Sequence, residues 1–320
     1  MLLICASHSP LQLTDIEATD PDKHRGYFQA LDRCANALAS FRPDFIVVFA
    51  PDHFNGLFYD LMPSFCIGVE AQSTQDWGIA QFRVPVPREE ALACARNVMA
   101  QGIDAAISYR LHVDHGTTIP LIRLRALEAG YPVMPVLINC AADPRPSFQR
   151  VRQFGSAIGA YLAQCGKKVV IVGSGGLSHD PPTPRLARSS GAIAERLIVR
   201  HVPARQELEE RQGRVMAACR ALVRGEGPML PPNNEWDRDF VSKFLAQDLE
   251  SLDQYTDEYL DRVAGFGAHE VRCWVAAAAA MKAAGAFSTE ERFYGIIPEW
   301  ATGMSVVTGQ HWSDGIHAFA

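Results

Sequence analysis

The stretch FIVVFAPDH, residues 45–53, has six consecutive apolar residues followed by proline, aspartate and histidine. A short, continuous apolar run of this kind predicts a β-strand that is covered on both faces. Five further runs share this character, at 2–6, 65–69, 105–109, 133–138 and 168–172. Amphipathic helical patterns separate them, at 27–41, 89–101, 119–129 and 148–164. The alternation predicts an α/β protein, a three-layer α/β/α sandwich around a mainly parallel, mixed central sheet.

The second half of the chain has a different pattern, because helical segments replace strands from about residue 185. These segments lie at 185–199, 206–223, 237–245, 257–263 and 269–284. From Tyr294 the sequence returns to loops, with at most a short strand at 305–308. We therefore expect one domain over 1–320, with an α/β core (1–183), a mostly helical C-terminal extension (184–292) and a tail (293–320).

The composition excludes several classes of protein. Of the 320 residues, 48% are apolar and 21% charged, which is typical of a globular protein. The net charge of −6 argues against a nucleic-acid partner, and no apolar run is long enough to span a membrane. The N-terminus MLLICASHSP lacks the features of a secretory signal, and the eight cysteines form no CxxC pair. We expect a cytoplasmic protein with reduced cysteines that binds neither nucleic acid nor membrane.

Four histidines lie close after predicted strands. His8, His53 and His179 follow three of them directly or after a short turn, and His115 follows a fourth after a short loop. Because the carboxyl ends of strands in an open α/β sheet share one edge, these side chains should converge. Imidazole is the commonest protein ligand of mid-row divalent metals, and a histidine off the metal can transfer protons near pH 7. The pattern predicts a metal site with acid–base groups at this edge.

The identity of a carboxylate ligand stays open on spacing alone. A metal held by two histidines usually has a carboxylate or a further histidine beside them. The candidates by position are Asp52, Asp114, Asp180, Glu270 and Glu299. Glu270 lies in the first turn of a predicted helix, where the helix dipole favours an acidic residue without any metal. Spacing alone favours this explanation for Glu270.

Six stretches resemble the class III extradiol ring-cleaving dioxygenases, a LigB-like superfamily. They are SHSP (7–10), FAPDHFNGLFYDLMPSFCIGV (49–69), VDHG (113–116), GSGGLSHDPP (173–182), HEVRCWVAA (269–277) and IPEWATG (297–303). They extend over nearly the whole chain, and the second and fourth are long and specific. The resemblance implies a LigB-like fold and Fe(II)-dependent cleavage of a catechol by O2, with both oxygen atoms incorporated, in the catabolism of aromatic compounds.

The resemblance also implies a role for each of five side chains. It makes His8, His53 and Glu270 the Fe(II) ligands, which replaces the helix-dipole explanation of Glu270. It makes His179 the base that deprotonates the catechol and His115 the acid that acts later in the reaction. We expect inactivation in air, because Fe(II) in an open site is oxidised readily.

The expected substrate is a catechol substituted next to the diol. The resemblance favours 3-(2,3-dihydroxyphenyl)propionate, which gives 2-hydroxy-6-oxonona-2,4-dienedioate. Asp114 is expected to orient an imidazole in the catalytic site, with capping of its loop as the alternative. The side chains expected to contact the substrate are Phe54, Phe58, Tyr59, Pro181 and Trp300. The family further implies a homo-oligomer, a tetramer or larger.

Three other functions remain open at this point. The same chemistry on another 3-substituted catechol differs only in the pocket around the substituent. A LigB-like binding protein without metal should lack ligands, and here all three are present. A zinc hydrolase would use the same histidines without consuming O2.

Overall fold

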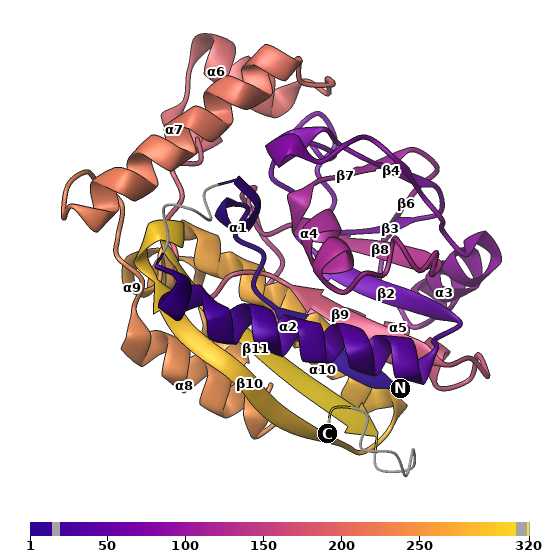
Figure 1. The fold of residues 1–320 in the computed structure, drawn as a ribbon. Helices are drawn as coiled ribbons and strands as arrows, with labels where there is room; N and C mark the ends of the chain where they lie inside the picture. The colour runs from indigo at the N-terminus through magenta and orange to yellow at the C-terminus, as the bar shows by residue number, and fades with distance from the viewer. Residues whose placement is uncertain (15–19, 312–318, 320) are drawn as a thin grey trace.

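The computed structural model describes residues 1–14, 20–311 and 319, and two sheets organise them (Figure 1). The large sheet contains β1 (Leu2–Ala6), β2 (Phe45–Ala50), β3 (Phe65–Gly68), β6 (Ala106–Ser108), β8 (Val133–Ile138), β9 (Val169–Ser174), β10 (Phe287–Ile297) and β11 (Thr302–His311). The small sheet contains β4 (Ala71–Ser73), β5 (Arg83–Val84) and β7 (Leu111–Val113). The order is β10-β11-β1-β9-β2-β8-β3-β6 in the large sheet and β5-β4-β7 in the small one. The four central strands β1, β9, β2 and β8 are parallel, and β11 and β3 flank them antiparallel.

Helices cover both faces of the large sheet. The α-helices of the described residues are α1 (Leu11–Thr14), α2 (Pro21–Phe41), α3 (Arg88–Ala100), α4 (His115–Arg123), α5 (Phe148–Leu162), α6 (Gly191–Ile198), α7 (Arg205–Val223), α8 (Asn234–Leu245), α9 (Asp257–Val263) and α10 (Val271–Ala284). Side chains of α2 and α4 pack on one face, and those of α3, α5, α8 and α10 on the other. The predicted three-layer α/β/α arrangement is confirmed.

The strand β1 shows why such apolar runs form the centre of the sheet. Successive side chains of a strand point to opposite faces. Leu3 and Cys5 accordingly pack in the core with α5 and α10, whereas Leu2 and Ile4 pack in the core with α2. All of these side chains are almost fully buried, so the run must be apolar at every position.

The C-terminal segment differs from its prediction. The expectation of a loop-rich tail with one short strand was wrong, because β10 and β11 form a long antiparallel pair and β11 pairs with β1. The edge strand β10 is only partly buried, and its sequence FSTEERFYGII mixes charged residues with apolar ones. Charged residues on an edge strand hinder unwanted pairing with other chains, but they also hide the strand from an analysis of hydrophobicity.

Two glycines of α5 bring this helix into direct contact with α10. A Cβ atom on Gly155 would lie 2.2 Å from the carbonyl oxygen of Ala276, and one on Gly159 would lie 2.1 Å from that of Ala280. Any larger residue would therefore push the two backbones apart. Since α10 begins directly after Glu270, this contact also fixes the position of the Glu270 side chain relative to the sheet.

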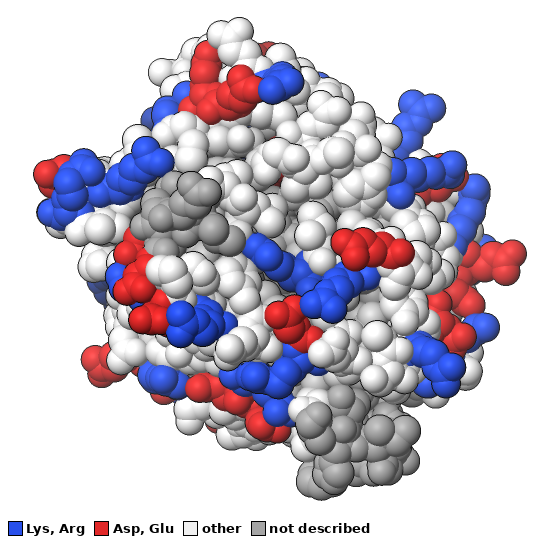
Figure 2. All heavy atoms as spheres, viewed as in Figure 1, with Lys and Arg blue, Asp and Glu red and all other residues white. Residues whose placement is uncertain are grey.

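The helices α6 and α7 form an arm at the end of the sheet where α1 lies (Figure 1). None of the helices in the described part of the chain is both long and apolar enough to cross a membrane. On the face drawn in Figure 2, Lys and Arg side chains are interspersed with Asp and Glu. That face therefore carries no extended field of one sign.

Candidate active site

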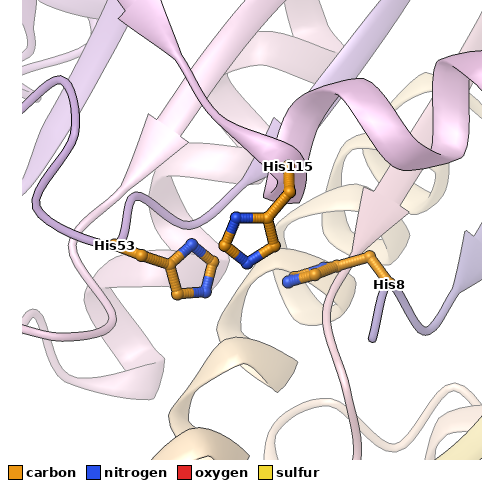
Figure 3. Close-up of side chains that lie close together, drawn as sticks. All are labelled: His8, His53 and His115. Atoms are coloured by element: carbon orange, nitrogen blue, oxygen red, sulfur yellow. The ribbon is translucent and has the colours of Figure 1, made fainter. Parts of the chain in front are cut away.

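Four histidines converge at the carboxyl edge of the large sheet, as the strand pattern predicts. The ring centroids of His8 and His53 are 5.5 Å apart, and that of His115 lies 5.6 Å from His8 and 4.1 Å from His53 (Figure 3). His8, His53 and His179 follow β1, β2 and β9, which are neighbours in the sheet. His115 follows β7 of the small sheet, not β6 as the sequence indicated, because β7 lies between β6 and this histidine.

Glu270 lies among these imidazoles. Its Oε1 is 3.1 Å from Nε2 of His53 and 3.5 Å from Nε2 of His179. Its Oε2 is 3.5 Å from Nε2 of His8 and accepts a hydrogen bond from the backbone N–H of Gly176. The carboxylate comes from the last residue of the 3₁₀ turn Phe266–Glu270, so α10 and the strand ends build one site.

Three of the other carboxylate candidates have different partners. Asp52 accepts hydrogen bonds from three backbone N–H groups of its own loop. Asp180 accepts from the backbone N–H groups of Leu230 and Phe266, and Glu299 pairs with a lysine. These contacts hold loops together and place none of the three carboxylates on the His8–His53 pair.

The second ring nitrogens of His8 and His53 are held by the protein. Nδ1 of His8 lies 2.9 Å from Oγ of Ser174, which itself donates to the carbonyl of Gly116. The Ser174 oxygen therefore accepts a hydrogen bond from Nδ1–H of His8. Nδ1 of His53 likewise donates to Oδ2 of Asp114 at 3.0 Å. Both rings thus have Nδ1 held by the protein and Nε2 directed at the Glu270 carboxylate.

This donor set fits a divalent metal. Neighbouring ligands of an octahedral ion with bonds of about 2.1 Å lie roughly 3.0 Å apart. The separations of Glu270 from His53 and His8, 3.1 and 3.5 Å, are close to that value. Two imidazoles and one carboxylate on one face are the ligands of non-haem Fe(II) oxygenases. His115 also offers a nitrogen within 4.8 Å of those of His8 and His53, so it lies at the rim of the same site.

Burial and neighbouring charges together decide which groups at the centre of the site are charged. Burial raises the pKa of Glu270, but the histidines around it, His179 and His53 among them, outweigh burial and hold this pKa well below its usual value. Burial lowers the pKa of His8 to about 3, so this ring stays neutral. Burial also lowers the pKa of His53, but Asp114 and Glu270 outweigh it and raise this pKa well above its usual value. A cation entering the site therefore meets two carboxylates and competes with a proton on His53.

The imidazole of His179 is confined between two glycines. A Cβ on Gly176 would lie 2.8 Å from its Cε1, and a Cβ on Gly267 only 2.1 Å from its Nε2. Nδ1 of His179 donates to the carbonyl of Leu177 at 2.8 Å, which leaves Nε2 free to accept a proton. Gly176, in the segment GSGGLSH, and Gly267 thus lie on the two sides of this ring, and neither position has room for a side chain.

His115 has an acidic partner that sequence reasoning missed. Its Nδ1 lies 2.5 Å from Oδ2 of Asp76, which also accepts from the His115 backbone N–H. The other oxygen of Asp76 accepts from Thr74 Oγ1. Asp76 is 39 residues away in the chain and lies in the turn Asp76–Gly78, so neither spacing nor a strand end indicated it. The contact fixes the ring with Nε2 available on its other side.

Asp114 has both of the roles considered for it. Its Oδ1 caps α4 by accepting from the backbone N–H of Gly116. Its Oδ2 accepts from the ring and backbone of His53 and from the side chain of Asn55. The imidazole that Asp114 orients is therefore that of His53, and its buried carboxylate stays ionised because His53 and His115 outweigh burial and lower its pKa.

A cavity of about 170 Å³ opens onto the four histidines and Glu270. Of the side chains expected to contact a substrate, Phe54, Pro181 and Trp300 line it. Phe58 and Tyr59 do not, contrary to expectation. Phe58 is fully buried in a small cluster against His201, and Tyr59 packs behind Phe54 at a ring distance of 5.7 Å, so both support the wall from outside.

Helix α7 covers the opposite side of this cavity. Arg211 reaches down from it and donates to the backbone carbonyl of His53 at 3.0 Å and to Oδ1 of Asn55 at 3.2 Å. Because Asn55 in turn contacts Asp114, the covering helix is linked to the loop that carries His53.

Comparison with known proteins is consistent with this geometry. Residues 2–305 match the family described as the catalytic LigB subunit of aromatic ring-opening dioxygenase. A protein from Cupriavidus pinatubonensis named 2,3-dihydroxyphenylpropionate/2,3-dihydroxicinnamic acid 1,2-dioxygenase is 42% identical over 305 residues, which cover 95% of this chain and 96% of that protein. One of the same name from Paraburkholderia xenovorans is 43% identical over 300 residues, 94% of each chain. The solved structure of an uncharacterized Escherichia coli K12 protein covers 96% of this chain and 99% of its own, with a TM-score of 0.50 at 14% identity, and so shares its fold.

Proposed function

The chain belongs to the family of catalytic LigB subunits of aromatic ring-opening dioxygenases, and on that premise we propose that it converts 3-(2,3-dihydroxyphenyl)propionate and O2 to 2-hydroxy-6-oxonona-2,4-dienedioate. The general activity is extradiol cleavage of a catechol in aromatic catabolism. The observation that carries the proposal is the meeting of Glu270 with His8 and His53 beneath a cavity bounded by two further histidines. The named substrate follows from the relatives, which are named for it.

The proposed metal is Fe(II), held by His8, His53 and Glu270. Bound there, Fe(II) supplies open coordination positions and the redox chemistry that couples a catechol to O2. Two of the three ligands are fixed through their far sides, His8 by Ser174 and His53 by Asp114. This support sets the direction of each Nε2 before any ion arrives.

His179 serves as the base in this proposal. The hydrogen bond from its Nδ1 to the Leu177 carbonyl leaves the Nε2 lone pair facing the cavity. That nitrogen can accept a phenolic proton from a catechol positioned over the triad. The glycines on either side of the ring keep it in one position relative to Glu270, so the Nε2 atom that accepts the proton has a defined position.

His115 serves as the acid. As an imidazolium it holds one proton on Nδ1 against Asp76 and a second on Nε2, which it can donate in the cavity. The Asp76 carboxylate stabilises the charged ring and keeps it oriented. The stacking of His115 on His53, with centroids 4.1 Å apart, holds the acid beside the metal site.

We also propose that the protein is one domain over 1–320, is a cytoplasmic homo-oligomer of four or more chains, and binds neither nucleic acid nor membrane. The single domain is supported by β11, which pairs with β1 and so joins the two ends of the chain in one sheet. The oligomer is supported by resemblance to the family, and sedimentation of the purified protein tests it.

The test of the function removes and replaces the metal. Protein stripped with a chelator is reconstituted without oxygen with Fe(II) or with Zn(II), then mixed with the catechol and O2. We expect stoichiometric O2 uptake and a yellow ring-opened product with Fe(II) alone. Turnover of a substrate with zinc and without O2 uptake would contradict the proposal and support a hydrolase. A higher kcat/KM for 3-methylcatechol than for the propionate would retain the chemistry and reject the named substrate.

A further inference from the structure

The side of the cavity opposite the histidines is formed by one face of α7. Leu208, Arg211, Val215 and Cys219 line the cavity from this helix. Their spacing of three or four residues places them in one stripe along the helix. Arg214 lies three residues after Arg211, beside this stripe, and it also lines the cavity. The wall thus combines apolar side chains with two arginines.

Three arginines line the cavity, and two of them have other partners. Arg211 is committed to the His53 carbonyl and to Asn55. Arg196 pairs with Glu207 at 3.8 Å. The side chain of Arg214 forms no ion pair or hydrogen bond within the described ranges 1–14, 20–311 and 319. Glu210 lies four residues before Arg214 on the same helix, where an ion pair between them would be favourable. Its carboxylate instead accepts a hydrogen bond from the side chain of Gln206 at 3.0 Å.

The two ends of the cavity differ in charge. The end with the histidines holds the carboxylates of Glu270 and Asp76, which repel an anionic group. The α7 side presents the guanidinium of Arg214. A ligand with a metal-binding diol at one end and a carboxylate at the other therefore has one favourable orientation.

The spacing along α7 suits such a ligand. Arg211 reaches the backbone of His53, so its position on the helix marks the level of the metal site. Arg214 lies three residues further, which is about 4.5 Å along the helix axis. A three-carbon substituent on a catechol ring spans a similar length, so the two spacings are compatible.

We propose that Arg214 binds the carboxylate of the catechol substituent and makes the enzyme selective for catechols with an anionic side chain. The inference rests on the proposed function and adds the residue that selects the substrate. The guanidinium donates two hydrogen bonds to the carboxylate, a geometry that a lysine cannot reproduce.

The test compares two substrates of equal chain length, 3-(2,3-dihydroxyphenyl)propionate and the uncharged 3-propylcatechol. In Arg214→Gln we expect the ratio of their kcat/KM values to fall about tenfold, through a higher KM for the propionate. Arg214→Lys should lie between the two. The matched control is Arg205→Gln on the same helix, since Arg205 is exposed, pairs with Glu209 and does not line the cavity. Its ratio should equal that of the wild type.

The outcomes distinguish a failure of the proposal about Arg214 from a failure of the proposed function. If the wild type cleaves no catechol, the proposed function fails. If the wild type favours the propionate and Arg214→Gln keeps the same ratio, or Arg205→Gln lowers it equally, the inference about Arg214 is wrong. A wild type that favours 3-propylcatechol also overturns it.

A second measurement requires neither metal nor O2. Trp77 and Trp300 line the cavity, so binding of 3-phenylpropionate to the metal-free protein should change tryptophan fluorescence. We expect about tenfold weaker binding to Arg214→Gln than to the wild type and to Arg205→Gln. Equal affinity in all three proteins contradicts a carboxylate site at Arg214.

Discussion

Gly267 allows a direct test of whether the position of His179 matters for catalysis. In Gly267→Ala the new Cβ would lie 2.1 Å from Nε2 of His179 and 2.2 Å from its Cδ2, whereas ordinary contacts begin at 3.4 Å. The imidazole must therefore move by about 1.3 Å. Alanine fits the backbone here, because Gly267 has no positive φ angle and lies in a 3₁₀ turn. The perturbation thus acts on the ring and leaves the local chain path intact.

A displacement of about 1 Å in a catalytic group costs on the order of 100-fold in rate, or about 2.7 kcal/mol of activation free energy. We expect kcat of Gly267→Ala to fall by that factor while metal content stays at the wild-type level, because His8, His53 and Glu270 keep their supports. The assay is O2 uptake with metal analysis of the same sample. Gly213→Ala is the matched control, since a Cβ at Gly213 meets nothing within 4 Å. Full metal with a wild-type kcat in Gly267→Ala would refute a positional role for His179.

Three further predictions concern carboxylates. Glu270→Ala should lose the metal, measured as metal per chain after gel filtration, and normal Fe(II) binding in this variant would show that the triad is wrong. Asp76→Asn should keep the metal but lower kcat about 100-fold or more, since the amide no longer stabilises the protonated His115; a kcat within twofold of the wild type would reject the pair. Asp237 is fully buried, and burial raises its pKa from 3.8 to about 6, so the folded protein binds a proton more tightly than the unfolded chain. The contribution of Asp237 to the free energy of unfolding should therefore decrease as pH rises from about 4 to 6, by up to about 3 kcal/mol, and stay lower above pH 6. Asp237→Asn should remove this decrease, measured by urea unfolding at pH 4.5 and 8, and an unchanged pH dependence would contradict it.

The central strands and the histidine cluster could be predicted from the sequence because they share one physical cause. Strands buried on both faces are apolar throughout, as in β1 and β2, so the first polar residues after them stand out. His8, His53 and His179 lie there, and the parallel order of the strands brings them to one edge.

The remaining parts depend on contacts that leave no local pattern. Glu270 is at the start of a helix, where the dipole explains an acid equally well, and only the family resemblance singled it out. Asp76 reaches His115 from a turn 39 residues away. The strand β10 was missed because its charged residues face solvent at the sheet edge, and β11 was expected only over 305–308. Phe58 and Tyr59 share a motif with Phe54, but only Phe54 faces the cavity.

The close contact between α5 and α10 has a consequence for experiments that score variants in bulk. In a deep mutational scan selected for growth on an aromatic carbon source, Gly155 and Gly159 should tolerate as few substitutions as the histidines, because any side chain meets the backbone of Ala276 or Ala280. Such a scan alone would place these glycines among the catalytic residues, although they touch no substrate. A parallel selection for cellular abundance would separate the groups, since variants of Gly155 and Gly159 should disappear from both, while those of His179 should disappear only from the first.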